Sequence, residues 1–500
     1  MKEMRKFTLA ILFIWFSVQI SQAQNRIIPI DTTVITSHST TINGVAINYT
    51  ATTGTQPVWN EDGEPIATLY YTYYKRTNVN KSANRPLLIS FNGGPGSASV
   101  WMHVAYTGPM ILNIDNEGYP IQPYGVHENP YSVLDVADIV FINPVNTGYS
   151  RMIKGKDDKM PDKKLFFGIN ADIKYLAEWI NTFVSRNNRW SSPKYIIGES
   201  YGGTRVSGLA LELQEKQWMY LNGVIMVSPA DYKVFNSDVP ISSGINLPYF
   251  AAAAWHHKVL PDALQQKDLL AVLDEVEQYT LSSLIPALAK GGFISSEEKM
   301  QVAKKMAYYS GLSEKSILQN NLAVPTQFFW KELLRNKSGF TIGRLDSRYL
   351  GIDKTDAGDS PDYSAELTSW LHSFTPAINY YLREHLKFKT DIKYNMFGPV
   401  HPWDRTNNNT REGLRKAMAE NPYLNVLFQA GYYDGATTYF NSKYTMWQID
   451  PSGKMKDRLS FKGYRSGHMM YLRKEDLKSA NDDLRSFILK SASNGKAAKY

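Results

Sequence analysis

The chain has 500 residues, of which 43% are hydrophobic, 20% are charged and none is cysteine. These proportions are ordinary for a soluble enzyme with a large core, and the lack of cysteine excludes a disulfide framework. The formal net charge is +8, but the basic residues are scattered rather than clustered with aromatic residues, so we expect a solvated surface and no nucleic-acid partner.

The first residues have the pattern of a secretory signal peptide. Lys2, Arg5 and Lys6 form a basic start, an apolar stretch follows over 7–20, and Ser21–Ala23 provides a small-x-small cleavage site. We therefore predict a signal peptide over 1–23 and an exported protein, either periplasmic or secreted. Its removal would leave a net charge of about +6. No membrane-spanning segment is predicted after residue 23.

The pattern along the rest of the chain predicts an α/β fold. The runs 45–49 and 66–74 suggest an early antiparallel hairpin region, and a helix is expected over 169–183 from its apolar residues at helical spacing. Short apolar runs are candidates for the strands of a mostly parallel sheet. They are 87–89, 138–142, 195–197, 223–227 and 425–430.

A glycine-rich loop, Phe91–Ser97, follows the first of these candidate strands and reads FNGGPGS. Because glycines leave backbone N–H groups unshielded, such a loop can supply one donor of an oxyanion hole. The alternatives are a structural turn and, less well supported, a phosphate-binding loop, since neither nucleotide-binding glycine pattern is present.

The segment Gly198–Gly203 reads GESYGG and lies directly between an apolar run and a helical pattern. Flanking glycines allow the sharp strand-to-helix turn, called a nucleophile elbow, that exposes a serine hydroxyl. Ser200 is therefore the candidate nucleophile. A glycine-rich turn with no catalytic role is the alternative.

Helical patterns replace the strand pattern between about 240 and 395. Leu264, Leu269 and Leu273 recur at helical spacing, and Ser295 and Ser296 suit the start of a further helix. We predict a helical insertion over 241–395 between two parts of an α/β-hydrolase core, at 24–240 and 396–500. We expect the insertion to act as a lid that shapes the substrate pocket; a plain structural elaboration is the alternative.

A serine nucleophile needs a base and an orienting carboxylate, which follow it in the order Ser, Asp or Glu, His in this fold. Asp434 follows the last candidate strand, and His468 is the one of nine histidines that lies beyond it. These residues are the predicted partners of Ser200. Taken singly, Asp434 could instead form a turn and His468 could be an ordinary core or surface residue.

Five segments together resemble the serine carboxypeptidase family. They are Asn92–Gly96, Asn143–Ser150, Gly198–Gly203, Ala430–Asp434 and Gly467–Met469. The segment Gly343–Arg348, which reads GRLDSR, is similar to the bacterial branch of that family.

The resemblance implies a function for several residues. Ser200, Asp434 and His468 would form the triad, and the N–H groups of Gly94 and Tyr201 would form the oxyanion hole. Asn92 and Glu199 match positions that bind the terminal carboxylate of the substrate. A glutamate binds another carboxylate only when it is protonated, so the resemblance implies acid-favoured peptidase activity.

Two positions depart from the family pattern. Ser90 and Tyr106 stand where the best-known members have a tryptophan and a glutamate of the carboxylate-binding network. Tyr106 could point into the site and donate its hydroxyl to the substrate, or it could pack as a core aromatic residue.

The sequence therefore predicts an exported serine carboxypeptidase that acts on peptides with a free C-terminus and needs no cofactor or metal, since zinc-binding histidine spacing and cysteine ligands are both missing. An esterase or acyltransferase with the same triad is the alternative within the fold. A catalytically silent binding protein is the alternative from another class. The sequence does not indicate the oligomeric state.

Overall fold

The computed structural model describes residues 26–79, 84–230, 239–406, 409–492, 495 and 497–498. The predicted signal peptide over 1–23 lies outside the described residues. The first described elements are long antiparallel strands, β1 (Thr32–Ile42), β2 (Val45–Trp59) and β3 (Pro65–Arg76). This region contains the predicted early hairpin, which is confirmed, while β1 was not predicted.

The central sheet has the strand order β1-β2-β3-β7-β4-β9-β10-β13-β14, and β8 (Arg151–Met152) pairs with β3. From β7 to β14 all neighbours are parallel. These strands are β7 (Asp138–Ile142), β4 (Leu87–Phe91), β9 (Lys194–Glu199), β10 (Gly223–Val227), β13 (Asn425–Gly431) and β14 (Leu459–Tyr464). The five predicted parallel strands are confirmed, and β14 is an addition at the edge.

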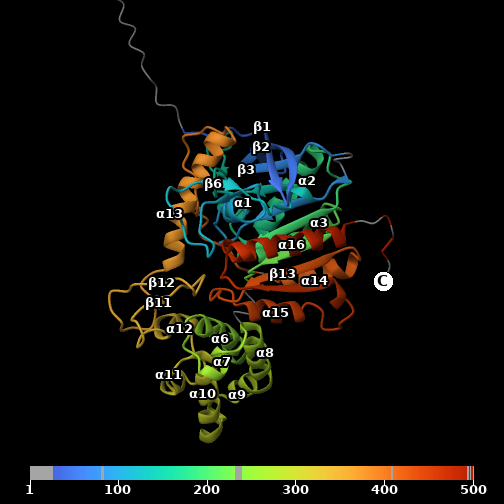
Figure 1. Cartoon of the computed structure of the whole chain (residues 1–500). Coiled ribbons are helices and arrows are strands. Elements are labelled where there is room, and N and C mark those ends of the chain that lie inside the picture. Colours follow the sequence, from blue (N-terminus) through green and yellow to red (C-terminus); the bar gives the residue numbers. More distant parts are fainter. Residues whose placement is uncertain are drawn as a thin grey trace, which may run out of the picture.

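Helices cover both faces of this sheet, as Figure 1 shows. One face packs on α2 (Ile169–Arg186), α3 (Tyr201–Lys216) and α14 (Thr410–Glu420), and the other on α1 (Trp101–Ala105), α13 (Ala365–Tyr380) and α16 (Lys474–Ser491). Neighbouring residues of one strand serve opposite faces: Leu88 packs with α1 and α16, and Ile89 packs with α2 and α3. Burial on both faces explains why these strands are continuous apolar runs.

The insertion forms a lobe with its own hydrophobic core at the bottom of the view in Figure 1. Its helices are α5 (Val239–Gly244), α6 (Leu247–His256), α7 (Asp262–Gln265), α8 (Leu269–Tyr279), α9 (Ile285–Ala289), α10 (Ser296–Ser310), α11 (Glu314–Gln319) and α12 (Thr326–Glu332). Ser295 caps α10 by accepting a hydrogen bond from the N–H of Glu298, as its sequence suggested. The lobe core also includes Tyr439 and Phe440 of α15 (Tyr439–Trp447). By contrast α13, although within 241–395, packs with the sheet.

Short elements complete the described structure. The small antiparallel pairs are β5 (Met110–Leu112) with β6 (Val126–Glu128) and β11 (Thr341–Ile342) with β12 (Leu350–Gly351). Single turns of 3₁₀ or π helix are η2 (Val133–Asp135), η3 (Lys163–Leu165), η4 (Thr280–Leu284), η5 (Gly291–Phe293), η6 (Tyr381–His385), η7 (Lys456–Arg458) and η8 (Met470–Leu472).

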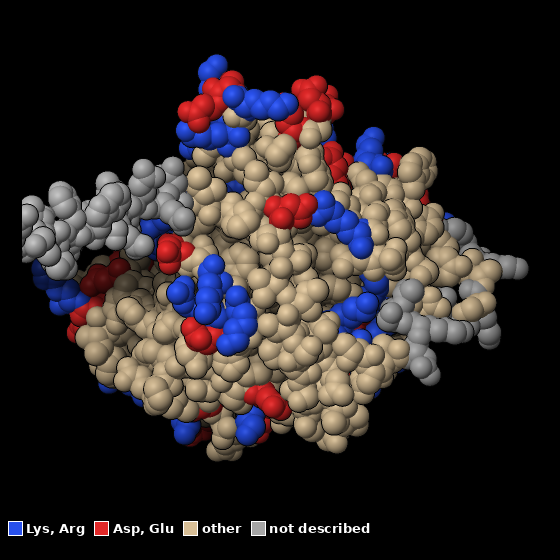
Figure 2. Space-filling model, turned by 90° about the horizontal axis from the view of Figure 1, so that it is seen from above, with Lys and Arg blue, Asp and Glu red and all other residues tan. Residues whose placement is uncertain are grey.

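The surface in Figure 2 carries basic and acidic side chains side by side in small groups, separated by uncharged areas. On this face, the charged residues are scattered as the sequence predicted for the surface as a whole. Among the described helices, none has both the length and the apolar character that a bilayer crossing requires.

Candidate active site

Ser200 lies at the turn between β9 and α3, at the carboxyl edge of the parallel strands. Its backbone has φ 58° and ψ −124°, a conformation that non-glycine residues rarely adopt. A Cβ atom on Gly198 would lie 2.1 Å from the carbonyl oxygen of Gly202, so the turn requires glycine there. The geometry is that of a nucleophile elbow, with the positive end of the α3 dipole beside the serine.

Asp434 and His468 lie in loops that follow β13 and β14. His468 Nδ1 is 2.7 Å from Asp434 Oδ2, and both side chains are buried. Asp434 also accepts hydrogen bonds from the N–H groups of Ala436 and Thr437, at 2.8 and 3.0 Å, and from the Thr437 hydroxyl at 2.6 Å. These donors fix the carboxylate, which in turn orients the imidazole with its Nε2 left for other partners.

The charge state of His468 reflects this pairing. Burial lowers the pKa of the imidazole, but the charge and hydrogen bond of Asp434 raise it more, so the net pKa is above its ordinary value. Glu199 raises it further and Arg344 lowers it. A histidine with a pKa above its usual value is a stronger base, which suits removal of a proton from a serine hydroxyl.

The end of β10 connects the serine to the histidine. Ser200 N–H donates to Val227 O at 3.0 Å, and the hydroxyl of Ser228 donates to His468 O at 2.8 Å. In the part of the chain that the structure describes, Ser200 Oγ forms no hydrogen bond with the imidazole. Such bonds often become short only when substrate is bound.

The glycine-rich loop after β4 packs directly on the elbow. A Cβ atom on Gly93 would lie 2.6 Å from the N of Tyr201, so only glycine permits this approach. Gly94 follows with φ 104°. Arg205 of α3 donates to Asn92 O at 2.6 Å and pairs with the buried Asp172 at 2.7 Å, which ties the loop to the helix. The loop thus brings Gly93 against Tyr201. The predicted oxyanion hole, formed by the N–H groups of Gly94 and Tyr201, stays a prediction.

Glu199, beside the nucleophile, is buried and bonded to two side chains. Tyr471 of η8 donates its hydroxyl to Glu199 Oε1 at 2.9 Å, and Asn92 Nδ2 donates to Oε2. Burial raises the pKa of Glu199 to about 7, although His468 and both hydrogen bonds oppose this increase. At acid pH the carboxyl is therefore neutral and can donate a hydrogen bond to an anion.

The hydroxyl of Tyr106 is directed into the core, so its candidate role as a substrate-binding residue is wrong. The side chain is fully buried, and its hydroxyl donates to Gln429 Oε1 at 2.7 Å and to Ala480 O at 3.2 Å. Its ring stacks on that of Tyr471, with centroids 4.9 Å apart. Tyr106 therefore packs as a core aromatic, the second of the two roles considered from the sequence, and supports the tyrosine that contacts Glu199. Ser90 is also buried.

Sequence reasoning missed two residues that contact the site, Thr437 and Tyr471. Thr437 lies three residues after Asp434, the spacing at which an aspartate accepts from the following turn. This spacing was the available signal for Thr437. Nothing in the local sequence marks Tyr471, because its partner Glu199 is 272 residues away. Within the described residues, no group of three or more histidine, aspartate and glutamate side chains is arranged to hold a metal ion.

Comparisons with known proteins concern the family and the fold of the chain. The sequence model of the serine carboxypeptidase family matches residues 58–456. Serine carboxypeptidase-like 8 of Arabidopsis thaliana is 28% identical over 189 residues, and serine carboxypeptidase-like 20 of the same plant is 31% identical over 202 residues. These alignments cover 35% and 37% of this chain, and the chain spans only 41% and 37% of the length of these relatives.

A solved structure resembles the fold over most of its length. It is the prohormone-processing carboxypeptidase Kex1(delta)p of Saccharomyces cerevisiae, with a TM-score of 0.50 and 15% sequence identity. The match covers 88% of this chain and 92% of the yeast chain. Together with the parallel sheet and its flanking helices, this match shows the α/β-hydrolase fold.

Proposed function

The chain belongs to the serine carboxypeptidase family, and from this premise we propose that it is an exported serine-type carboxypeptidase. It would release the C-terminal residue of peptides through an acyl-enzyme intermediate, without a cofactor or metal. The observation that carries the proposal is the grouping around one elbow. Glu199, bonded to Asn92, directly precedes Ser200, and the His468–Asp434 pair at 2.7 Å is connected to Ser200 through Val227 and Ser228 at the end of β10.

In the first step His468 acts as the general base. With Nδ1–H donated to Asp434, the free Nε2 takes the proton of Ser200 Oγ, which attacks the carbonyl carbon of the last peptide bond. The N–H groups of Gly94 and Tyr201 stabilise the oxyanion. His468 then gives the proton to the leaving amine, and the amino acid departs.

Water completes the cycle. His468 removes a proton from a water molecule, which attacks the acyl carbon and releases the shortened peptide, while Ser200 regains its proton. The dyad of Asp434 and His468 thus serves both halves of the reaction.

Recognition of the free C-terminus would fall to Glu199 and Asn92. A neutral Glu199 can donate to the substrate carboxylate, and the amide of Asn92 is a donor at any pH. Because burial raises the pKa of Glu199 to about 7, the carboxyl stays neutral in the acid range. This arrangement favours cleavage at a chain end over cleavage within a chain.

The inserted helices would act as the lid over this edge of the sheet. His257, which follows α6, lies with Nε2 2.6 Å from Ser347 O, and the His256 ring lies 5.2 Å from that of Tyr433. A Cβ atom on Gly435 would meet the Tyr249 hydroxyl at 2.4 Å, so the lobe packs directly on the loop that carries Asp434. The basic and apolar pattern of residues 1–23 supports export.

One observation favours an esterase or acyltransferase with the same triad as a second candidate. Because the Tyr106 hydroxyl is bonded to Gln429 and Ala480, the predicted carboxylate network is reduced to Glu199 and Asn92. A weaker carboxylate site would tolerate other acceptors and leaving groups.

Digestion of a peptide library, followed by mass spectrometry, tests the proposal. We expect products shortened only from the C-terminus, and little cleavage of the same library with amidated C-termini. Ser200→Ala serves as the inactive control, and labelling by a fluorophosphonate verifies an activated serine. Internal cleavage, or equal cleavage of free-acid and amidated peptides, would reject the carboxypeptidase in favour of the esterase or acyltransferase. A wild-type protein that the fluorophosphonate does not label would indicate a catalytically silent binding protein.

A further inference from the structure

The loop of residues 343–349, between β11 and β12, is bonded to the chain on both sides of Asp434. Gly435 N–H donates to Arg344 O at 3.0 Å, and Ser347 donates to Tyr433 O through its N–H at 3.0 Å and its hydroxyl at 2.8 Å. The 343–349 loop therefore holds the residues immediately before and after the triad carboxylate.

The same loop is bonded to the segment that carries His468. His468 N–H donates to Leu345 O at 2.6 Å, and Leu345 N–H donates to the buried Glu366 at 2.8 Å. A Cβ atom on Gly467 would lie 2.4 Å from Leu345 O and 2.5 Å from Asp346 Cβ. There is thus no room for the histidine loop to shift toward the 343–349 loop, and its main-chain bond opposes a shift away.

A buried ion pair fixes the shape of the 343–349 loop. Arg348 Nε lies 3.0 and 3.2 Å from the two carboxylate oxygens of Asp346, and Nη2 lies 2.7 Å from Oδ2. The side chains of Asp346 and Arg348 are 2% and 4% exposed. Asp346 also accepts from the N–H of Arg348 at 3.1 Å, and Tyr349 N–H donates to Asp346 O at 3.1 Å. Planar guanidinium contacts of this kind have a fixed geometry that lysine cannot copy.

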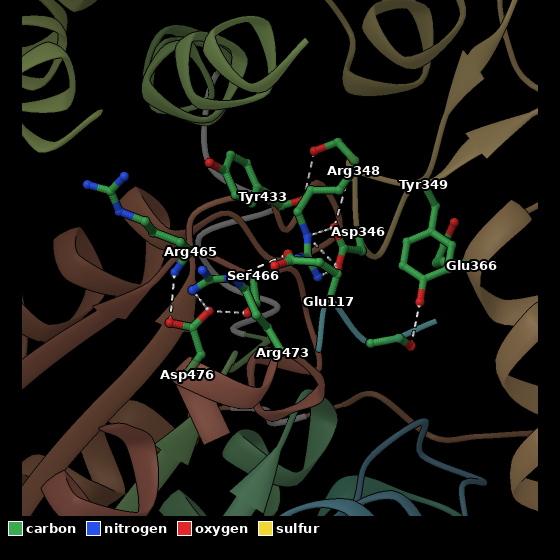
Figure 3. Close-up of polar contacts among 12 residues, drawn as sticks. Glu117, Asp346, Arg348, Tyr349, Glu366, Tyr433, Arg465, Ser466, Arg473 and Asp476 are labelled. Atoms are coloured by element: carbon green, nitrogen blue, oxygen red, sulfur yellow. Dashed lines mark hydrogen bonds and ion pairs between the residues drawn. The ribbon is translucent and has the colours of Figure 1, made fainter. Parts of the chain in front are cut away.

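The pair is linked through Glu117 to Arg473, as Figure 3 shows. Glu117 accepts from Arg348 Nη1 at 3.1 Å and from Arg473 Nε at 3.2 Å. Arg473 lies 3.5 Å from Asp476, which accepts a hydrogen bond from the Ser466 hydroxyl. Residues 466 and 473, which flank His468, are therefore tied to the same charged network.

We propose that Asp346 and Arg348 are positioning residues for the triad. Their ion pair keeps the 343–349 loop in the shape that holds Asp434 and His468 at the distance and orientation their hydrogen bond requires. The proposal rests on the proposed function, since it assigns these residues a part in the same reaction. Neither side chain touches the triad, and each acts through the main chain of Arg344, Leu345 and Ser347. A buried ion pair adds little net stability, so fixed geometry is its main physical contribution here.

The test compares buried arginines at two places. Arg348→Gln and Arg348→Lys break the pair with Asp346; Arg189→Gln breaks a matched pair, Arg189–Asp138 at 2.6 Å, with side chains 2% and 0% exposed at the other end of the sheet. For each variant the folded fraction is measured by circular dichroism, and kcat, KM and the rate of fluorophosphonate labelling are expressed per folded molecule.

We expect Arg348→Gln to lower kcat and the labelling rate about 100-fold, the loss that a shift of about 1 Å in catalytic groups can cause, with little change in KM. Arg348→Lys should recover little, because it restores the charge but not the planar fork. Asp346→Asn should resemble Arg348→Gln, and the double variant should be no worse than either, since the pair acts as one unit. Arg189→Gln should lower stability and leave kcat unchanged.

Unchanged kcat and labelling per folded molecule in the Arg348 variants, or an equal loss in Arg189→Gln, would overturn the proposal. If Arg348→Gln does not fold, Arg348→Lys and Asp346→Asn decide by the same measure. A wild type that neither reacts with fluorophosphonate nor cleaves peptides would instead reject the proposed function, so the two failures are distinguishable.

Discussion

Asp138 at the amino ends of the parallel strands and Asp434 at their carboxyl ends are both fully buried carboxylates, yet their partners differ. Asp138 contacts Arg85 at 2.8 Å and Arg189 at 2.6 Å, whereas Asp434 contacts His468 at 2.7 Å. Arginine keeps its proton at every pH that a folded protein survives, but histidine gains and loses one near neutrality. The same kind of pair is therefore structural at one end and suited to proton transfer at the other.

The backbone differs between the two ends as well. At the amino ends, Arg189 Nη2 donates to the carbonyl of Arg85, so a side chain occupies a backbone hydrogen-bonding group just before β4. At the carboxyl ends, Gly93 lies against Tyr201 where no Cβ atom would fit, and Gly94 and Ser200 have positive φ. The proposed catalysis would depend on these glycine-lined loops and on a proton that can move, rather than on buried charge as such.

The largest expected effect on kcat comes from replacing aspartate by asparagine at Asp434, and the same replacement at Asp138 is its comparison. Asp434→Asn keeps an oxygen for the N–H groups of Ala436 and Thr437 but turns an NH₂ toward His468, which forces the wrong tautomer. We expect kcat to fall about 10⁴-fold with little loss of stability. Asp138→Asn should leave kcat per folded molecule unchanged and lower the free energy of unfolding by about 3–5 kcal/mol.

Steady-state kinetics and urea unfolding of both variants measure this contrast. Near-wild-type rates in Asp434→Asn would contradict the proposed difference between the two ends of the sheet, because another group would then orient His468. A loss of activity per folded molecule in Asp138→Asn would contradict it as well.

The parallel strands, the strand-to-helix turn at Ser200 and the pairing of Asp434 with His468 could be predicted because their signals are local or depend on chain order. Strands buried on both faces are apolar runs, and the elbow is a short motif whose partners must follow it in order. The edge strands β1 and β14 were missed because residues along them are half-exposed or exposed, which weakens the apolar pattern.

Contacts between distant segments could not be predicted in the same way. Tyr471 contacts Glu199 and Arg348 contacts Glu117, and these partners lie 272 and 231 residues apart. The role of Tyr106 stayed open because it depends on the direction of one side chain after a short helix, and packing on Tyr471 decides that direction. Arrangements of this kind come from tertiary packing.

A smaller effect is expected from the oxyanion loop. Gly94→Val should lower kcat by about 100-fold, the typical loss of one oxyanion donor, because the branched side chain and the altered φ displace the N–H group. Gly63→Val is the matched control, since Gly63 also has a positive φ of 75° but has open space around it, in the turn between β2 and β3. Its kcat should be unchanged. Equal kcat in both variants would locate the oxyanion donors elsewhere.

The pH dependence of KM should distinguish Glu199 from its amide analogue. The pKa of Glu199 is raised to about 7, so the carboxyl is neutral below that pH and charged above it, where it repels a substrate carboxylate. We expect KM for a free-acid peptide to rise above about pH 7 by up to tenfold per pH unit in the wild type. In Glu199→Gln, KM should stay level because the amide donates at every pH.

Peptides with an amidated C-terminus control for pH effects unrelated to the carboxylate, and their KM should be level in both enzymes. Glu199→Gln also removes a negative charge that raises the pKa of His468, so the acid limb of kcat should move to lower pH. If the wild-type KM changes by about twofold or less between pH 6 and 8, this role of Glu199 is contradicted.

The smallest effect concerns Arg344, an exposed residue whose backbone binds Gly435 and whose charge lowers the pKa of His468. Arg344→Gln should raise the pKa of His468. Since the base must be neutral, the acid limb of kcat should then move to higher pH, by less than about one unit, because solvent screens an exposed charge.

The shift should vanish at about 1 M salt, where the screening length is about 3 Å. Arg335→Gln, in the lobe and paired with Glu332, is the control and should not move the limb. A shift that persists in high salt would mean that Arg344 acts through loop geometry rather than charge. Arg344 would then belong with Asp346 and Arg348 among the residues that position the triad side chains.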